Sequence, residues 1–373
     1  MGARSDSVNV QDLLKDMMAH NASDLHLKAG GPPYFRVDGV LRESDFPKLS
    51  PNDLVEIAFA LMNERQAKRF AERNEVDFTY GLSGIGRFRA NIFKQRGTVG
   101  LAIRRVLTSE IPSFEELGLP PVLERLSEEQ RGMVLVTGPA GAGKTTTLAA
   151  MIDYINTNRR CNIITIEDPI EVLHVDKRSI IHQREIGTDT EDYAQALKYV
   201  TRQDPDVILI GEMRDPETVM AAMNTAMTGH LVLSTFHTTD TTETINRIID
   251  FFPPLQQKQV RLTIASVLKG VISQRLLPLK DREGRVPACE VMIMSDRMVE
   301  AVLKEEPTYA LRHIVAEGSF YGMQTFDQSL LDLYKFGLLE FKTAVAASTN
   351  PHDFTLAAKQ IGLEVEDEML SRF

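Results

Sequence analysis

The sequence predicts an α/β protein of two domains, a larger C-terminal domain built on a parallel sheet and a smaller N-terminal α+β domain. After residue 121, apolar strands alternate with helical segments, whereas before residue 108 short strands of period two are mixed with helices. The stretch 108–121 shows neither pattern. A length of 373 residues also favours two domains over one.

The N-terminal domain is predicted over residues 1–107. An amphipathic helix over 10–19 precedes the strand-like segments "SDLHLKA" and "YFRVDGVLRE". A second helix is expected after Ser50, which can cap it, with Pro51 in the first turn. The segments "GRFRANIF" and "VGLAIRRV" alternate apolar and polar residues, which predicts a hairpin with one buried face.

A linker is predicted over 108–121, because "TSEIPSFEELGLPP" has three prolines and no sustained periodicity. The second domain is predicted over 122–373. Its strands are expected in "GMVLVTG", "NIITIED", "DVILIGE" and "HLVLSTF", and such apolar strands are typical of a parallel sheet covered on both faces. Beyond residue 255 the pattern predicts mostly helix, including 256–277 and 325–337, as a C-terminal extension.

Composition excludes several classes of protein. A net charge of −10 disfavours broad binding of nucleic acid, so no nucleic-acid partner is expected. Two cysteines, Cys161 and Cys289, are too few for a disulfide framework or a four-thiolate zinc site. No apolar run reaches the ~18 residues that cross a bilayer, which predicts a cytoplasmic chain without a transmembrane segment.

The clearest motif is "GPAGAGKT", which fits the pattern G-x-x-x-x-G-K-[ST] and lies between a strand and a helix. Backbone N–H groups of such a turn bind phosphate oxygens, the lysine reaches the β- and γ-phosphates, and the threonine hydroxyl ligates Mg²⁺. We therefore expect ATP and Mg²⁺ as cofactors. The predicted nucleotide-binding residues are Gly138, Pro139, Ala140, Gly141, Ala142, Gly143, Lys144, Thr145 and Thr146, with Thr145 also a metal ligand.

Acidic residues follow two other predicted strands. Glu212 ends "DVILIGE", a strand expected to neighbour the phosphate-binding strand and to bring a carboxylate toward Mg²⁺. Glu167, Asp168 and Glu171 follow "NIITI". Because parallel strands end at one edge of a sheet, these acids should face Lys144, and one of them can deprotonate the attacking water.

Two histidines bracket the strand "HLVLSTF", with His230 before it and His237 at its end, where a γ-phosphate sensor would lie. The predicted N-terminal hairpin contains six cations and no acid: Arg87, Arg89, Lys94, Arg96, Arg104 and Arg105. Because the chain as a whole is acidic, we interpret these cations as uncompensated. Some of them could reach nucleotide phosphates across a domain or subunit boundary.

Taken in order, these segments resemble the secretion superfamily of hexameric ATPases, and within it the type IV pilus retraction group, PilT and PilU. "GPAGAGKTTTLAAM", "TIEDPIE", "ILIGEMRDPET" and "TGHLVLSTFHT" are similar to that family's Walker A, acidic, Walker B and histidine boxes. "GMQTFDQSLLDLYKFGLL" leans toward PilU, whereas "MVEAVLKEE" at 298–306 departs from a retraction motif that contains arginine. The resemblance implies a RecA-like motor domain and a PAS-like N-terminal domain.

The resemblance also implies roles for individual residues. Glu171 would be the general base with Glu167 and Asp168 in support, and Glu212 would act through the water shell of Mg²⁺. His230 and His237 would couple nucleotide state to subunit contacts, and Arg247 would lie at an interdomain nucleotide pocket. Four hairpin arginines would approach ATP held by a neighbouring subunit: Arg89, Arg96, Arg104 and Arg105.

The expected function is that of an ATP-hydrolysing ring that drives pilus retraction and twitching motility. The implied partners are five further copies in a homo-hexamer, an inner-membrane platform protein at the base of the pilus, and a second retraction ATPase. A nucleic-acid translocase on a RecA-like core is the alternative, and it would need a basic pore. A nucleotide-regulated switch with little turnover is a third interpretation.

Overall fold

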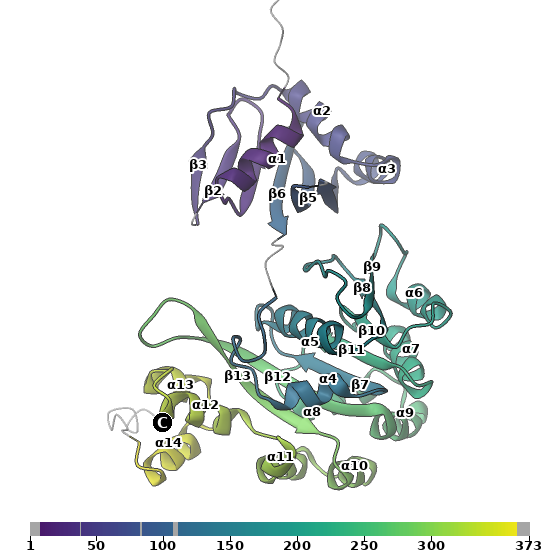
Figure 1. Ribbon diagram of the computed structural model, residues 1–373, viewed down its shortest axis with the longest axis vertical. Coiled ribbons are helices and arrows are strands. Elements are labelled where there is room, and N and C mark those ends of the chain that lie inside the picture. The colour runs from purple at the N-terminus through teal and green to yellow at the C-terminus, as the bar shows by residue number, and fades with distance from the viewer. Residues whose placement is uncertain (1–7, 38, 83, 107–110, 364–373) are drawn as a thin grey trace, which may run out of the picture. The chain divides into compact units, whose positions relative to one another are not determined.

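The computed structural model describes residues 8–37, 39–82, 84–106 and 111–363. The chain divides into two compact units (Figure 1). Unit 1 comprises residues 1–110 with 169–173, and unit 2 comprises residues 111–168 with 174–373. Residues 108–110 of the predicted linker lie outside the described residues, whereas Phe114 and Leu119 are buried in a core cluster of unit 2.

Unit 1 is a six-stranded antiparallel sheet with three helices. The helices are α1 (Val10–Ala19), α2 (Pro51–Leu61) and α3 (Glu64–Arg73). The strands are β1 (Asp24–Leu27), β2 (Tyr34–Val37), β3 (Val40–Glu43), β4 (Glu75–Leu82), β5 (Gly86–Gln95) and β6 (Thr98–Val106). They pair in the order β3-β2-β1-β6-β5-β4.

The first helix, the cap at Ser50 and the hairpin predicted for unit 1 are confirmed. Helix α1 has the predicted bounds, and its residues Leu13, Leu14 and Met17 are fully buried. The Ser50 hydroxyl accepts a hydrogen bond from the Asp53 N–H, while the Asp53 carboxylate accepts one from the Ser50 N–H, which is a capping box. Strands β5 and β6 form the hairpin, and the six predicted apolar residues of its one face are buried: Phe88, Ala90, Ile92, Val99, Leu101 and Ile103.

Unit 2 is built on a seven-stranded sheet in the order β13-β12-β7-β11-β10-β8-β9. Neighbouring strands are parallel except β12 and β13. The strands are β7 (Gly132–Thr137), β8 (Asn162–Glu167), β9 (Ile180–Glu185), β10 (Val207–Ile210), β11 (Leu231–Phe236), β12 (Leu268–Pro278) and β13 (Arg285–Ile293). The predicted α/β class with a parallel sheet is confirmed.

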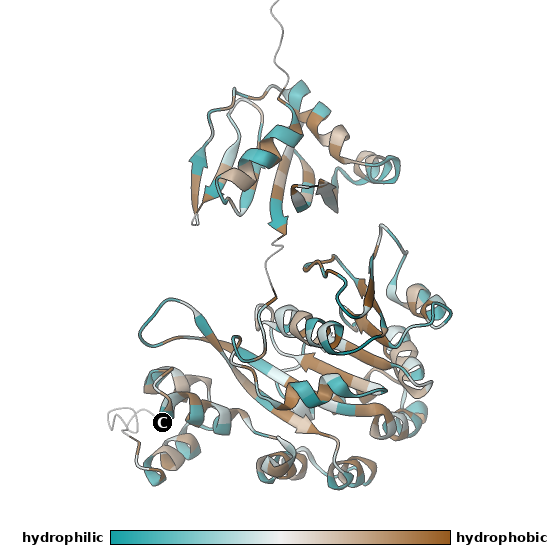
Figure 2. Ribbon diagram, in the orientation of Figure 1, coloured by the Kyte–Doolittle hydropathy of each residue, from teal (hydrophilic) through white to brown (hydrophobic). Residues whose placement is uncertain are grey.

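Helices cover both faces of this sheet because the strands are apolar on both sides (Figure 1). Val134 and Val136 of β7 pack with α4 (Val122–Glu128) and α5 (Lys144–Asn158), whereas Met133 and Leu135 pack on the other face. Figure 2 colours the central strands mostly brown, in agreement with their burial. The helices of the other face are α6 (Tyr193–Val200), α7 (Pro216–Met227), α8 (Thr241–Asp250), α9 (Pro254–Val267), α10 (Asp296–Leu303) and α11 (Thr308–Glu317).

The chain after β13 is helical, as expected. Besides α10 and α11 it contains the 3-10 turn Ser319–Tyr321, α12 (Phe326–Lys335), α13 (Phe341–Ala347) and α14 (Pro351–Gln360). The last three helices share a small core with Val286 and Ala288 of β13, in which Phe326, Leu330 and Phe354 are fully buried.

The prediction of helix over 256–277 is wrong for its second half. The helix α9 ends at Val267, and strand β12 begins at Leu268 and pairs with both β7 and β13. Strand β9 was also missed. An apolar run such as "LKGVISQRLL" suits a buried helix and a buried strand equally well, and only the pairing with β7, far away in sequence, decides between them.

Candidate active site

The carboxyl ends of four parallel strands meet at one edge of the unit 2 sheet. In the pairing register Thr137 of β7 lies opposite Phe236 of β11, and Ile210 of β10 lies opposite both Ser234 of β11 and Ile166 of β8. Glu167 is the last residue of β8, and the segments that follow the other three strands carry Lys144, Glu212 and His237. They therefore come together at one edge, where open α/β sheets bind ligands.

The order of the strands corrects one detail of the prediction. Strand β10, which precedes Glu212, does not neighbour the phosphate-binding strand β7, because β11 lies between them. The strand that ends before His237 is thus the neighbour of β7. Sequence order alone could not distinguish these two arrangements, since both place the acid at the same edge.

The turn from 138 to 143 joins β7 to α5, and three of its glycines have positive φ angles. Gly138, Gly141 and Gly143 have φ angles of 139°, 77° and 90°, which are accessible to glycine but costly for other residues. Lys144, only 8% exposed, donates hydrogen bonds to the carbonyl oxygens of Gly138 at 2.8 Å and Pro139 at 2.9 Å. Its ammonium group is therefore held within the loop.

Glu212 is the centre of a charged cluster at the same edge. Its Oε2 lies 2.7 Å from Nε of Arg214 and 3.3 Å from Nε2 of His237. The side chain of Glu212 is 14% exposed, whereas that of His237 is half exposed. The structure thus brings together two predicted site residues, and Arg214 is a third member that the sequence interpretation missed although "GEMRD" places it two residues after the acid.

Glu167 ends β8 on the far side of β10, and its Oε1 accepts a hydrogen bond of 2.6 Å from the Thr165 hydroxyl. The hydroxyl of Tyr193, at the start of α6, interacts electrostatically with the acids of the same edge. Burial raises the pKa of the Tyr193 hydroxyl, and the negative charges of Glu212, Asp168 and Glu167 raise it further. The phenol therefore stays neutral near these carboxylates.

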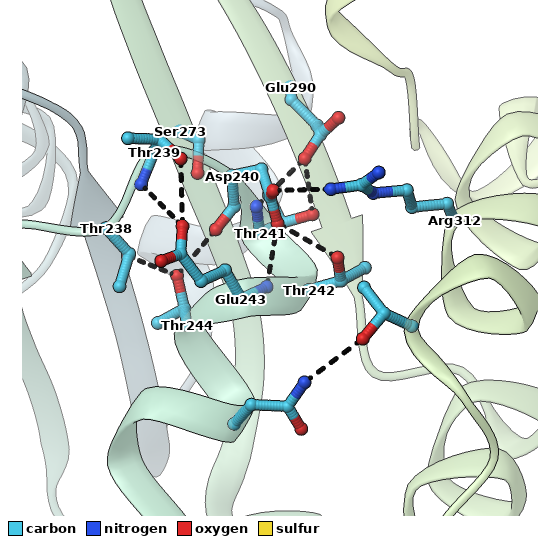
Figure 3. A network of polar contacts seen from close by, with 12 residues as sticks. Thr238, Thr239, Asp240, Thr241, Thr242, Glu243, Thr244, Ser273, Glu290 and Arg312 are labelled. Carbon is cyan, nitrogen blue, oxygen red and sulfur yellow. Dashed lines mark hydrogen bonds and ion pairs between the residues drawn. The ribbon is translucent and has the colours of Figure 1, made fainter. Parts of the chain in front are cut away.

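A polar network fixes the segment that follows His237 (Figure 3). Asp240 caps α8 by accepting a hydrogen bond of 2.7 Å from the Glu243 N–H, and it forms an ion pair of 2.8 Å with Arg312 of α11. The N–H and hydroxyl of Thr241 both donate to the buried Glu290 of β13, at 2.9 and 2.8 Å. Burial raises the pKa of Glu290, which these two hydrogen bonds counteract. The residues after His237 are thus tied to α11 and β13.

Two other predicted residues lie away from this edge. His230 precedes β11 and so lies at the opposite, amino edge of the sheet, where its Nδ1 is 3.0 Å from the carbonyl oxygen of Thr225 at the end of α7. Arg247 lies in the last turn of α8 and stacks over the ring of Phe251, with 5.5 Å between the guanidinium and the ring centroid. Neither is brought together with Lys144.

The basic hairpin belongs to unit 1, and the view that its cations are uncompensated is wrong for Arg89 and Arg104. Asp77 of β4 forms an ion pair with Arg89, and Asp24 of β1 lies 2.8 Å from Nε of Arg104. Arg105 donates to the side-chain oxygen of Asn21. Arg96 is exposed in the turn between β5 and β6, with a φ of 46°. The compensating acids come from strands distant in sequence, so the local charge count missed them.

Glu171 is exposed to solvent. It belongs to residues 169–173, which are grouped with unit 1. Its role as the general base stays a prediction. In the described part of the chain no helix is long and apolar enough to cross a membrane.

The residues at the site fit Mg²⁺ bound together with a nucleotide. Among residues 8–37, 39–82, 84–106 and 111–363, no three His, Cys, Asp or Glu side chains are grouped as a metal site. Thr145, exposed in the first turn of α5, and Glu212 offer two oxygen ligands. Mg²⁺ is commonly bound by one or two protein oxygens and completed by phosphate and water, which matches this donor set.

A glycine-rich turn between a strand and a helix of a RecA-like sheet defines a P-loop nucleotide-binding domain. The family model described as "Type II/IV secretion system protein" matches residues 6–325. The chain therefore belongs to the type II/IV secretion system protein family, which confirms the superfamily predicted from the sequence.

Within this family the chain is similar to pilus ATPases. It is 41% identical to "Type IV pilus retractation ATPase PilT" of Pseudomonas aeruginosa over 93% of this chain and 100% of that one. It is 40% identical to "Type IV pilus ATPase PilU" of the same organism, over 97% of this chain and 94% of the other. A crystal structure of the pilus retraction motor PilT with bound ADP superposes with a TM-score of 0.84 at 45% identity, covering 93% of this chain and 98% of that chain.

Proposed function

We propose that the chain is a Mg²⁺-dependent ATPase that powers type IV pilus retraction and twitching motility. The observation that carries this proposal is the meeting of Lys144, Glu212 and His237 at one edge of a parallel sheet, in a chain about 40% identical to the two pilus ATPases. The similar crystal structure of PilT, which contains ADP, supports nucleotide binding by this chain.

The nucleotide would be held by the loop and the start of α5. Backbone N–H groups from Gly138 to Thr146 surround the phosphates, and Lys144 exchanges its carbonyl partners for β- and γ-phosphate oxygens. Thr145 and Glu212 are the residues that would hold Mg²⁺, which would supply positive charge against the phosphates when bound. The His237 ring, beside Glu212, is placed to sense the γ-phosphate.

Hydrolysis would proceed by attack of water on the γ-phosphate. Glu171 accepts the proton of that water. The carboxylate of Glu167, at the same edge of the sheet, helps to orient the water. Products are ADP and phosphate. The network around Asp240 gives His237 a connection to α11, which provides a route from the nucleotide to the helical extension.

The motor would be a homo-hexamer at the cytoplasmic base of the pilus. ATP binding closes unit 1 of one subunit onto unit 2 of its neighbour, and hydrolysis reopens it. Arg89, Arg96, Arg104 and Arg105 are the candidates for contacting ATP in trans, with Arg247 and His230 at subunit or domain contacts. The ring would act on an inner-membrane platform protein and disassemble pilin, beside a second retraction ATPase.

The purified full chain tests this proposal. We expect the chain to release phosphate from ATP in the presence of Mg²⁺. EDTA should abolish this release and excess Mg²⁺ should restore it, because two protein oxygens bind the metal weakly unless a nucleotide supplies further ligands. Light scattering should give six times the mass of one chain. Expression should restore twitching to cells that lack their own retraction ATPase. Release stimulated by DNA, without restored twitching, would favour the translocase instead.

Glu171→Gln is expected to lower kcat by about 100-fold or more, because the amide cannot accept the proton of the attacking water. The Kd for ADP should change by less than about 2-fold, since this side chain is not assigned to phosphate binding. Single-turnover phosphate release and ADP titration measure the two quantities. Full activity of this variant would move the general base elsewhere, with Glu167 the first alternative.

A further inference from the structure

The acidic loop, residues 168–173, leaves β8 at Glu167 and returns to unit 2 at His174. One side chain contacts both of these ends. Nε2 of Gln183, on β9, donates to Oε1 of Glu167 at 3.2 Å, and Oε1 of Gln183 accepts from the N–H of His174 at 2.9 Å. A single amide group thus bridges the base of the loop.

The position of Gln183 in the sheet explains how it can do this. Gln183 lies opposite Thr165 in the parallel pairing of β8 and β9. Thr165 donates to the same Glu167 oxygen, at 2.6 Å. Two donors from adjacent strands therefore fix one oxygen of Glu167, and an amide is the side chain that can also accept from His174.

The chain beyond His174 is anchored separately to the P-loop helix. Asn156 of α5 is fully buried, its Nδ2 donates to the carbonyl oxygen of Val175 at 2.8 Å, and its Oδ1 accepts from the N–H of Lys177 at 3.0 Å. Lys177 also forms an ion pair of 2.8 Å with Asp153 of α5. The segment that follows the loop is thus fixed to α5, and Gln183 links the start of this segment to the end of β8.

We propose that Gln183 is a positioning residue that sets the geometry of the acidic loop and so of Glu171. This inference rests on the proposed function, in which Glu171 is the general base. Gln183 does not touch the nucleotide in this scheme. Its effect on the reaction passes through the loop that it closes.

The test replaces Gln183 with methionine, which has a similar volume and cannot make either hydrogen bond. We expect Gln183→Met to lower kcat by about 10- to 100-fold, as for other residues that hold a catalytic group, with KM for ATP and Kd for ADP within about 2-fold of wild type. Amide hydrogen exchange should increase over 168–176. Gln183→Glu keeps the acceptor for His174 but sets a carboxylate against Glu167, so it should not restore kcat.

A double-mutant cycle separates positioning from general destabilisation. If Gln183 acts through Glu171, adding Gln183→Met to Glu171→Gln should cost less than about 3-fold further in single-turnover rate. Two matched variants serve as references. Gln203→Met changes an exposed glutamine of the same unit and should leave kcat and Tm unchanged, whereas Asn156→Ala removes the partner of the Val175 carbonyl and of the Lys177 N–H and should lower Tm.

The positioning role is overturned if Gln183→Met has wild-type kcat, if its losses multiply with those of Glu171→Gln, or if it lowers Tm as Asn156→Ala does. These outcomes differ from failure of the proposed function. In that case the wild-type chain itself would release no phosphate from ATP.

Discussion

Lys144→Ala is expected to reduce ATP turnover by at least about 100-fold, the scale on which removal of a single charge-stabilising donor lowers kcat. The ammonium group of Lys144 lies 2.8 and 2.9 Å from two loop carbonyls, and the residue is only 8% exposed, so its charge is held inside the turn. Alanine would leave the phosphates without their closest positive side chain. Phosphate release and nucleotide titration of the purified ring measure the effect.

The control for this experiment is Lys258→Ala, which removes an exposed lysine of α9 in the same unit and should leave turnover within about 2-fold. Lys258→Ala should keep the wild-type Tm within a few degrees, whereas Lys144→Ala removes the donor to two loop carbonyls and should lower Tm modestly. Undiminished turnover in Lys144→Ala would remove the loop from the mechanism, and with it the nucleotide-binding role of residues 138–146.

The phosphate-binding loop could be predicted from sequence because everything that defines it is local. The glycines of the turn, Lys144 and the flanking strand and helix lie within one continuous segment. The meeting of Glu212 and His237 was also predictable in outline, since parallel strands share one carboxyl edge. What failed depended on partners far away in the chain. Strand β12 looks helical without β7 beside it, and Arg104 looks unpaired without Asp24.

The same reasoning explains why Gln183 and Arg214 were missed. Gln183 lies in "IIHQRE", a short, partly exposed edge strand with no recognisable motif, and its role exists only because β9 pairs with β8. The Asp240–Arg312 ion pair joins residues 72 positions apart. Residues that hold a loop from a neighbouring strand leave no periodic or compositional signal, whereas residues that bind phosphate through backbone geometry do.

Gly138→Ala is expected to have the largest effect on stability of any change in the loop. The φ of 139° at Gly138 belongs to a region that only glycine adopts readily, and a Cβ there would lie 2.5 Å from the backbone carbonyl oxygen of Gln274 on β12. The Gln274 carbonyl belongs to the backbone of β12, which is paired on both sides, so it cannot move away as the end of a flexible side chain could. We expect a loss of about 3 kcal/mol or more in the free energy of unfolding, together with loss of ADP binding.

Gly141→Ala is the matched control, since it changes the same residue type three positions later in the same turn. Its φ is 77°, so alanine is strained there by about 1–2 kcal/mol, but a Cβ at this position meets no atom within 4 Å. Thermal unfolding and ADP titration of both variants separate the two contributions. A Tm of Gly138→Ala no lower than that of Gly141→Ala would mean that β12 does not support the loop, and that the turn derives its shape from glycine conformation alone. A lower Tm with lost ADP binding would show instead that the strand missed from sequence is what holds the phosphate-binding loop in place.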